Sequence, residues 1–372
     1  MGRPGQRRGV HRGAGRVRAR AVRVIDWSAN PLRDPGARPS DDDRPLHFHR
    51  GLPGYAPTPL IEAPALASEW GVGRAWLKFE RERFGLPAFK LLGVSWAARR
   101  LLGEPPYDPE LELVAATDGN HGRAVARVAR EAGIGATILV PAEAAPARID
   151  AIAGEGARVE VVDGSYDDAV RRSAALAGPR RLVLSDTSWP GYEEVPRRVI
   201  EGYATIFCEV DEQAGGAPID VAVIPIGVGA LAAAAARHLA GRARLAGVEP
   251  TTAACMLESV RAGEITEVPG PHPSIMAGLN AGLPSLVAWP LVSGGFDILC
   301  GVEDEVAVEG TRRLASLGLA VGECSGGAAG AAGRLLADPG ARAALGAGPG
   351  SSVLVLLTEG VTDPDAYARL VA

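Results

Sequence analysis

Short apolar runs alternate with longer amphipathic stretches along the chain from about Asp41 to the C-terminus. The short runs predict strands over 75–79, 111–116, 136–140, 158–162, 181–185, 221–226, 245–248 and 352–357. The stretches between them predict helices over 90–102, 122–132, 166–177, 195–209, 230–240, 303–317 and 326–337. This alternation predicts an α/β fold with largely parallel sheets. Ligands bind at the C-terminal ends of such strands, so chemistry is expected in the turns after Ala116, Ser185, Ile226 and Leu357.

The N-terminal region differs in composition from the rest of the chain. Its first 25 residues contain eight arginines and no acidic residue, with glycine and proline scattered among them. Such a segment has too little apolar surface to fold, so we predict that residues 1–45 form a disordered basic tail. The whole chain has 372 residues, 47% hydrophobic and 22% charged, which is enough for about two globular domains.

Composition also argues against several classes of protein. The net charge of −5 argues against nucleic acid as a partner. The four cysteines, at 208, 255, 300 and 324, form no CxxC pair, so reduced thiols are expected rather than a disulfide framework or a metal site. The apolar run 221–236 is shorter than the roughly 20 residues of a membrane span, and the N-terminus lacks the apolar segment of a signal peptide. We therefore expect a cytoplasmic protein with no membrane partner.

Lysine is almost absent from the chain. Among 39 basic residues only Lys78 and Lys90 are lysines, so a reaction that needs an amine has two candidates. Lys90 begins a predicted helix inside an apolar run, where poor solvation should lower its pKa and suit it to form a Schiff base. Lys78 lies beside Glu80 and Arg81 and is interpreted as the ion-paired end of a strand. Lys90 is the better catalytic candidate.

Two glycine turns follow predicted strands. The first contains Thr117, Asp118, Gly119, Asn120 and His121 and leads into a helix, whose N-terminus suits an anionic group; ordinary helix capping explains the same residues equally well.

The second turn, Gly227-Val228-Gly229-Ala230, would cradle a phosphate on backbone N–H groups. It also fits the pattern G-x-G-x-x-A with Glu249 about 20 residues on. A nicotinamide-dependent oxidoreductase is therefore an alternative at this point.

Six segments together resemble a known family. They are 84–93, 117–122, 185–194, 226–230, 275–280 and 358–364, and they occur in the order found in diaminopropionate ammonia-lyases. These enzymes belong to the fold type II pyridoxal-phosphate enzymes with the tryptophan-synthase-β-like fold. The resemblance extends from about His47 to the C-terminus, and segments 185–189 and 276–280 make it specific. It implies a large cofactor-binding domain of residues 46–111 and 195–372, a small domain of residues 112–194, and a homodimer.

The resemblance also implies a role for each residue of the motifs. Lys90 would bond pyridoxal 5'-phosphate, Asn120 would contact the ring oxygen of the cofactor, and Thr358 would face the pyridine nitrogen. The phosphate would be bound by Gly227, Val228, Gly229 and Ala230. The substrate carboxylate would be held by Thr117, Gly119 and their loop. Asp118 and Asp186 resemble the acidic pair that distinguishes this family from serine and threonine dehydratases.

The implied reaction converts 2,3-diaminopropionate to pyruvate and two molecules of ammonia. The cofactor acts as an electron sink, Lys90 or one of the aspartates removes the α-proton, and the carboxylates of Asp118 and Asp186 recognise the β-ammonium group. The chain departs from the family pattern at Ala281-Gly282-Leu283. A dehydratase-like reaction, a β-replacement and an inactive binding homologue are therefore further alternatives.

Overall fold

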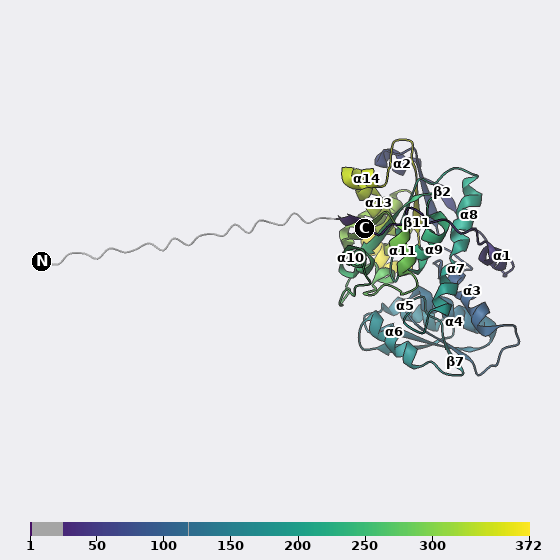
Figure 1. The fold of residues 1–372 in the computed structure, drawn as a ribbon. Coiled ribbons are helices and arrows are strands. Elements are labelled where there is room, and N and C mark those ends of the chain that lie inside the picture. Colours follow the sequence, from purple (N-terminus) through teal and green to yellow (C-terminus); the bar gives the residue numbers. More distant parts are fainter. Residues whose placement is uncertain (2–24, 118) are drawn as a thin grey trace.

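The computed structural model describes Met1, residues 25–117 and residues 119–372, whereas residues 2–24 and Asp118 lie outside the described residues. Strands and helices alternate along the described chain (Figure 1). The strands are β1 (Ile25–Ala29), β2 (Leu60–Glu62), β3 (Arg74–Phe79), β4 (Glu112–Ala116), β5 (Gly135–Pro141), β6 (Arg158–Val162), β7 (Arg181–Val183), β8 (Val221–Pro225), β9 (Arg244–Pro250), β10 (Ile298–Val302) and β11 (Ser352–Leu357).

Fifteen α-helices are present in the described residues. They are α1 (Arg44–Arg50), α2 (Pro64–Trp70), α3 (Lys90–Leu102), α4 (Asn120–Ala132), α5 (Pro146–Ala153), α6 (Tyr166–Ala175), α7 (Glu194–Gly202), α8 (Ala204–Ala214), α9 (Ala230–Leu239), α10 (Cys255–Ala262), α11 (Trp289–Gly295), α12 (Asp304–Ser316), α13 (Glu323–Ala337), α14 (Pro339–Ala344) and α15 (Pro364–Val371). Two short 3-10 helices, η1 (Thr251–Ala253) and η2 (Ala277–Leu279), complete the set.

The larger sheet has seven strands in the order β1-β10-β9-β8-β11-β3-β2. The two edge strands, β1 and β2, run antiparallel to their neighbours, and the inner pairs are parallel. The inner strands are apolar on both faces, as expected for a sheet covered on both sides. In β8, Val221 and Val223 pack under α12 and α13, whereas Ala222 and Ile224 face the cluster that contains α9.

The smaller sheet has four parallel strands in the order β6-β5-β4-β7 and lies below the larger one in Figure 1. Helix α6 covers one face, through Ala169 and Val170, and α4 and α5 cover the other. The core that includes α4 continues through α3 and α7 to the larger sheet, so one apolar cluster spans both sheets. The predicted α/β fold with largely parallel sheets is confirmed.

Two sequence predictions need correction. Strand β1 pairs with β10 along its whole length, so the prediction of disorder is wrong for these residues of the expected tail. A short edge strand depends on its partner for stability and has little local signal. The predicted helix 195–209 is divided into two helices, α7 and α8, at the buried residue Tyr203. There Gly202 approaches α3 so closely that a Cβ would lie 2.5 Å from the carbonyl oxygen of Leu92.

Candidate active site

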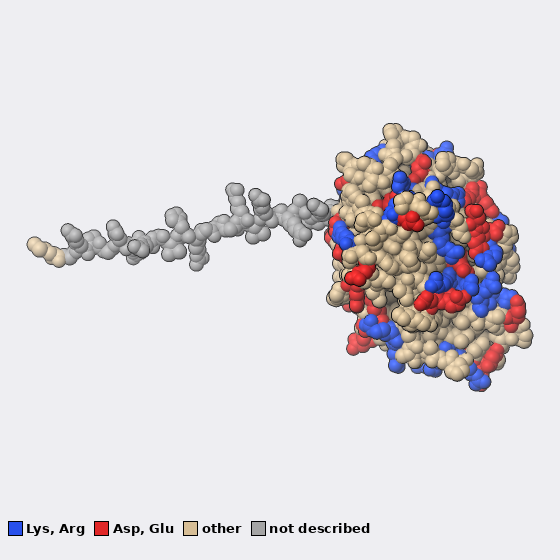
Figure 2. Space-filling model, in the orientation of Figure 1, with Lys and Arg blue, Asp and Glu red and all other residues tan. Residues whose placement is uncertain are grey.

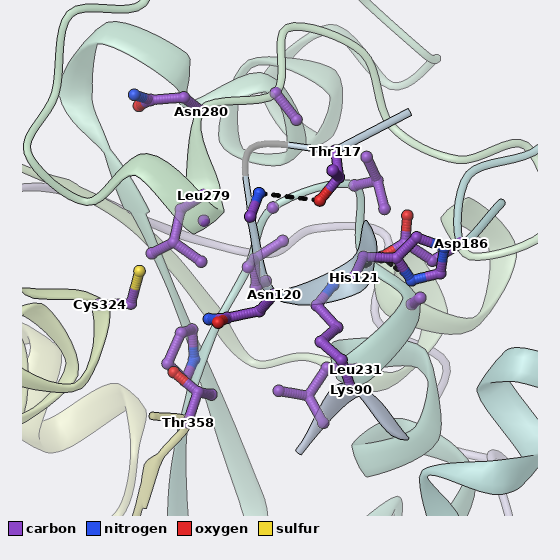
Figure 3. Close-up of a pocket in the computed structure, with 18 of the residues that line it drawn as sticks. Lys90, Thr117, Asn120, His121, Asp186, Leu231, Leu279, Asn280, Cys324 and Thr358 are labelled. Carbon is purple, nitrogen blue, oxygen red and sulfur yellow. Dashed lines mark hydrogen bonds and ion pairs between the residues drawn. The ribbon is translucent and has the colours of Figure 1, made fainter. Parts of the chain in front are cut away.

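A pocket lies between the two sheets and receives the C-terminal ends of four strands, β4, β7, β8 and β11. It encloses about 770 Å³ of space, which includes open solvent at its mouth. Figure 3 shows Lys90, Asp186 and His121 on one side, Thr358 and Cys324 on the other, and Asn120 between them. The predicted residues that line it are Lys90, Thr117, Gly119, Asn120, Asp186, Gly227, Val228, Gly229, Ala230 and Thr358. Asp118 lies outside the described residues.

The glycine turn after β8 forms the floor of the pocket. Gly229 has φ +99°, a conformation that favours glycine, and a Cβ there would lie 2.8 Å from the Met256 Cε atom. A Cβ on Gly227 would lie 3.2 Å from the carbonyl oxygen of Gly278. Helix α9 begins at Ala230, directly after the turn. The positive φ of Gly229 therefore favours glycine in this turn, which presents a helix N-terminus to an anionic ligand.

Lys90 is the first residue of α3 and its amine contacts a carboxylate. The Nζ atom donates a hydrogen bond of 2.5 Å to Oδ2 of Asp186, which follows β7. The Lys90 side chain is 20% exposed and that of Asp186 is 5% exposed. The expectation of an apolar surround for Lys90 is therefore wrong, because the fold brings in an acidic partner from 96 residues away.

Asp186 is an anion at neutral pH although it is buried. Burial opposes its ionisation, but His121 and Lys90 outweigh burial and lower the pKa of Asp186 to about 2. His121 donates through Nε2 to the carbonyl oxygen of Leu184, and its Nδ1 lies 3.7 Å from Oδ2 of Asp186. Burial lowers the pKa of His121. Sequence reasoning gave His121 no role, although it lay within a quoted motif.

The turn after β4 is braced by its own side chains. Thr117 Oγ1 accepts hydrogen bonds from the backbone N–H groups of Gly119, at 2.8 Å, and Gly122, at 3.0 Å. Gly122 also packs against Thr117, because a Cβ at this position would lie 2.4 Å from the threonine methyl carbon. This bracing sets the direction of the N-terminus of α4, where Asn120 enters the pocket.

The turn after β11 supplies the opposite wall. Thr358 and Glu359 are both buried and line the pocket. Glu359 Oε2 accepts a hydrogen bond of 2.6 Å from Asn120 Nδ2. Sequence reasoning quoted the segment but gave Glu359 no role; an acidic residue two positions after a largely apolar strand was the available signal.

Glu249 does not reach the pocket in the way the nicotinamide alternative requires. Its carboxylate is fully buried and accepts 2.8 Å hydrogen bonds from the backbone N–H groups of Met256 and Leu257 at the start of α10. Burial raises the pKa of Glu249 to about 8. Because the carboxylate is engaged in capping a helix, it is not available to a ribose hydroxyl.

Charges elsewhere on the described surface are mixed in sign. Figure 2 shows basic and acidic side chains interspersed on the face drawn, and many form ion pairs such as Arg242–Asp211 and Arg198–Glu194. Within residues 25–117 and 119–372, no group of three or more His, Cys, Asp or Glu side chains is arranged to hold a metal ion. None of the helices described is both long and apolar enough to cross a membrane.

Comparisons with known proteins point to one family. A family model described as pyridoxal-phosphate dependent enzyme matches residues 52–359. Diaminopropionate ammonia-lyase of Escherichia coli (strain K12) is 36% identical over 292 residues, which cover 72% of this chain and 73% of that protein. The Salmonella typhimurium enzyme of the same name is 33% identical, with 72% and 74% covered. The crystal structure of the Escherichia coli enzyme in complex with an aminoacrylate-PLP azomethine reaction intermediate has a TM-score of 0.86, with 31% identity and coverage of 93% of this chain and 96% of that one.

Proposed function

Because this chain belongs to the pyridoxal-phosphate dependent enzymes, and among them to the diaminopropionate ammonia-lyase family, we propose that it converts 2,3-diaminopropionate and water to pyruvate and two molecules of ammonia. The observation that carries the proposal is the ion pair of Lys90 with Asp186, at 2.5 Å, in the same pocket as the glycine turn after β8. An amine, a carboxylate and an anion cradle are the groups that such a reaction needs. The nicotinamide alternative leaves the first two without a function.

The pocket residues fit pyridoxal 5'-phosphate. We assign the phosphate to Gly227, Val228, Gly229 and Ala230, where any side chain at Gly229 would collide with Met256. We assign the ring oxygen to Asn120, the pyridine nitrogen to the buried hydroxyl of Thr358, and the aldehyde carbon to Lys90. When bound, the cofactor draws electrons from the α-carbon of the amino acid and makes its proton removable.

Lys90 and Asp186 would divide the proton and charge chemistry between them. A carboxylate with a pKa of about 2 is a poor proton acceptor but a permanent anion, which suits recognition of the β-ammonium group of the substrate. Lys90, the first residue of α3, lines the pocket and would accept the α-proton of the substrate on Nζ.

The loop after β4 would bind the other end of the substrate. We assign the substrate carboxylate to the loop that contains Thr117 and Gly119, at the N-terminus of α4, where a helix end favours an anion. From the family resemblance we also propose that Asp118 is the second acidic residue and an alternative base. Two bases on different elements would allow both enantiomers of the substrate to react.

A substrate panel tests the proposed reaction. Purified enzyme with cofactor is assayed for pyruvate release from both enantiomers of diaminopropionate and from serine; 2-oxobutanoate is assayed when threonine is supplied. The proposal expects the highest kcat/KM with diaminopropionate, because only this substrate offers Asp186 a β-ammonium group. Preference for serine or threonine by tenfold or more would instead assign a dehydratase reaction.

We also propose a division into two domains. Strands β4 to β7 form their own sheet, which supports a small domain of residues 112–194 beside a large cofactor-binding domain of residues 46–111 and 195–372. The four cysteines are free thiols, three of them buried, which supports a reducing compartment such as the cytoplasm. From the family resemblance we also propose that the enzyme is a homodimer. Sedimentation velocity of the purified enzyme tests the dimer.

A further inference from the structure

Glu359 is a buried carboxylate that the proposed reaction does not use. It is 3% exposed and lines the pocket beside Thr358. Its two oxygens accept hydrogen bonds from different elements: Oε2 from Asn120 Nδ2 at 2.6 Å, and Oε1 from the backbone N–H of Cys324 at 3.4 Å. Burying a carboxylate in a pocket costs desolvation energy, so a buried glutamate at this position is expected to have a function.

The backbone around Glu359 connects the elements that carry the assigned cofactor contacts. Gly360 donates to the carbonyl oxygen of Pro87 at 2.9 Å, and Glu359 forms a β-bridge with Ala88, two residues before Lys90. Ser325 on α13 donates to the carbonyl oxygen of Glu359 through Oγ at 2.9 Å and accepts from its N–H at 3.0 Å. Glu359 thus has a rigid backbone and a side chain that crosses to α4.

The chemistry of the Glu359–Asn120 contact selects one orientation of the amide. A carboxylate only accepts hydrogen bonds, so only the NH₂ group of Asn120 can face it. That NH₂ group has two hydrogens, and one remains for a second acceptor. A neutral amide at position 359 would offer both a donor and an acceptor, and Asn120 would then be free to turn its own oxygen to either side.

We infer that Glu359 is a positioning residue that holds Asn120 with its NH₂ group toward the ring oxygen of the cofactor. The inference rests on the proposed function, since it is the assigned cofactor contact of Asn120 that gives this orientation its use. The ring oxygen is an acceptor, so the fixed NH₂ group presents the matching donor before the cofactor arrives. The negative charge of Glu359 close to the ring additionally favours the protonated form of the yellow chromophore at Lys90.

The variant Glu359→Gln tests the inference with readouts other than turnover. The expected results are a cofactor Kd that is about 10- to 100-fold higher, as for the loss of one hydrogen bond to a charged group, and a pH midpoint of the visible band about one unit lower. Kd is measured by titrating cofactor-free protein, and the band by absorbance from pH 5 to 10. Glu323→Gln is the matched control, because Glu323 is a buried carboxyl on the neighbouring turn of α13 that does not line the pocket. It should leave the cofactor Kd unchanged, because Glu359, not Glu323, accepts the hydrogen bond from Asn120.

A double-mutant cycle shows whether Glu359 acts through Asn120. In an Asn120→Ala background, Glu359→Gln should change the Kd by less than about threefold; an undiminished effect would overturn the inference. A wild-type Kd and band in folded Glu359→Gln would overturn it as well, while leaving the proposed function intact. If wild-type protein itself shows no visible band with the cofactor, the proposed function fails. If circular dichroism shows that Glu359→Gln is unfolded, Glu359→Asp is tested instead, because the shorter side chain withdraws the carboxylate from Asn120. The same changes in Kd and in the visible band are then expected.

Discussion

The two lysines of this chain both pair with a carboxylate, but they differ in burial and in the number of hydrogen bonds that they donate. Lys90 donates one hydrogen bond, to Asp186, and its side chain is open to the pocket at 20% exposure. Lys78 is fully buried and donates three, to Glu209 Oε2 at 2.6 Å, to the carbonyl oxygen of Thr58 at 2.7 Å and to Gln213 Oε1 at 2.9 Å. An ammonium group has three donors, so Lys78 has no capacity left for a ligand, whereas Lys90 has two.

Lys78 belongs to a larger buried network that is neutral overall. Arg83 contacts Glu80 and Glu209 through its guanidinium group, and all four charged side chains are at most 1% exposed. Arg83 also begins the turn to Leu86, four residues before Lys90. Burial lowers the pKa of Lys78 although the neighbouring glutamates oppose it. Lys78, whose three donors are all used, therefore supports the loop that leads to Lys90, and Lys90 keeps two donors for a ligand.

Replacing Lys90 should have the largest effect on function. In Lys90→Ala the bond to the cofactor and the proton-accepting amine are lost together, so pyruvate release should fall by about 10⁴-fold or more. Arg100→Ala, on the exposed face of the same helix, is the control and should retain wild-type turnover. Borohydride treatment should fix the visible band covalently in the control and not in Lys90→Ala. Retained turnover in Lys90→Ala would contradict the catalytic role of Lys90 and leave Lys78 as the lysine that acts in the reaction.

Asp186→Asn should separate charge recognition from cofactor binding. The asparagine keeps the shape of the side chain but removes the anion that holds Lys90, so kcat/KM for diaminopropionate should fall by about 10²-fold or more. Cofactor Kd should change little. With serine, which lacks the β-ammonium group, the loss should be smaller. Equal losses with both substrates would show that Asp186 acts only on Lys90, and unchanged turnover would remove it from the mechanism.

Lys78→Met should affect stability instead of chemistry. It leaves the Glu209 carboxylate buried with one cationic partner fewer, a change that costs about 3–5 kcal/mol of unfolding free energy. Urea unfolding followed by tryptophan fluorescence measures it. Arg74→Met is the control, since Arg74 lies on the same strand in an ion pair with Glu62 that is nearly half exposed, and it should cost at most about 1 kcal/mol. The double variant Lys78→Met/Glu209→Gln should recover part of the loss. A loss as small as that of Arg74→Met would contradict a supporting role for Lys78.

The difference between the two lysines was only partly predictable from the sequence. Lys90 stood out because an apolar run and a helix start surround it, and the strand ends around it were recognised from their patterns. The prediction that Lys78 is ion-paired at a strand end is confirmed, but its partner, Glu209, lies 131 residues away on α8. Glu209 lies on the second of the two helices that the continuous helical pattern of 195–209 did not distinguish.

Contacts between the sheets were hidden for a similar reason. Asp186 and Glu359 each followed a recognised strand, but their partners, Lys90 and Asn120, come from other parts of the chain. Local patterns predict elements and their ends; which ends face each other depends on strand order, and periodicity does not encode strand order. The family resemblance implied the role of each residue at the site. The structure added that the Lys90 amine contacts the carboxylate of Asp186.

The pH dependence of stability should also differ between the network around Lys78 and the pocket around Lys90, because each region contains a group with a lowered pKa. His49 is buried and interacts electrostatically with Arg83 and Glu209 of the network that contains Lys78. It bonds to Thr205 Oγ1 and the carbonyl oxygen of Leu92, and burial lowers its pKa to about 3. The unfolded chain binds a proton near pH 6.5 and the folded chain does not, so stability falls by about 1.4 kcal/mol per pH unit as pH drops from 6.5 toward 3. Asp186, with a pKa of about 2, contributes stability above pH 3.8 and loses it only as pH falls from there toward 2.

The support behind Lys90 should therefore weaken on acidification well before the ion pair in the pocket does. Urea unfolding at pH 7, 6 and 5 should show the His49 slope in the wild type and a flatter profile in His49→Gln, whose neutral amide can bond to the same two partners. Asp186→Asn should keep the wild-type slope over this range, because Asp186 stays ionised throughout it. If His49→Gln were as steep as the wild type, another buried histidine, such as His121, whose pKa burial also lowers, would carry the acid sensitivity. The contrast between a proton-sensitive support and a proton-resistant Lys90–Asp186 ion pair would then not hold.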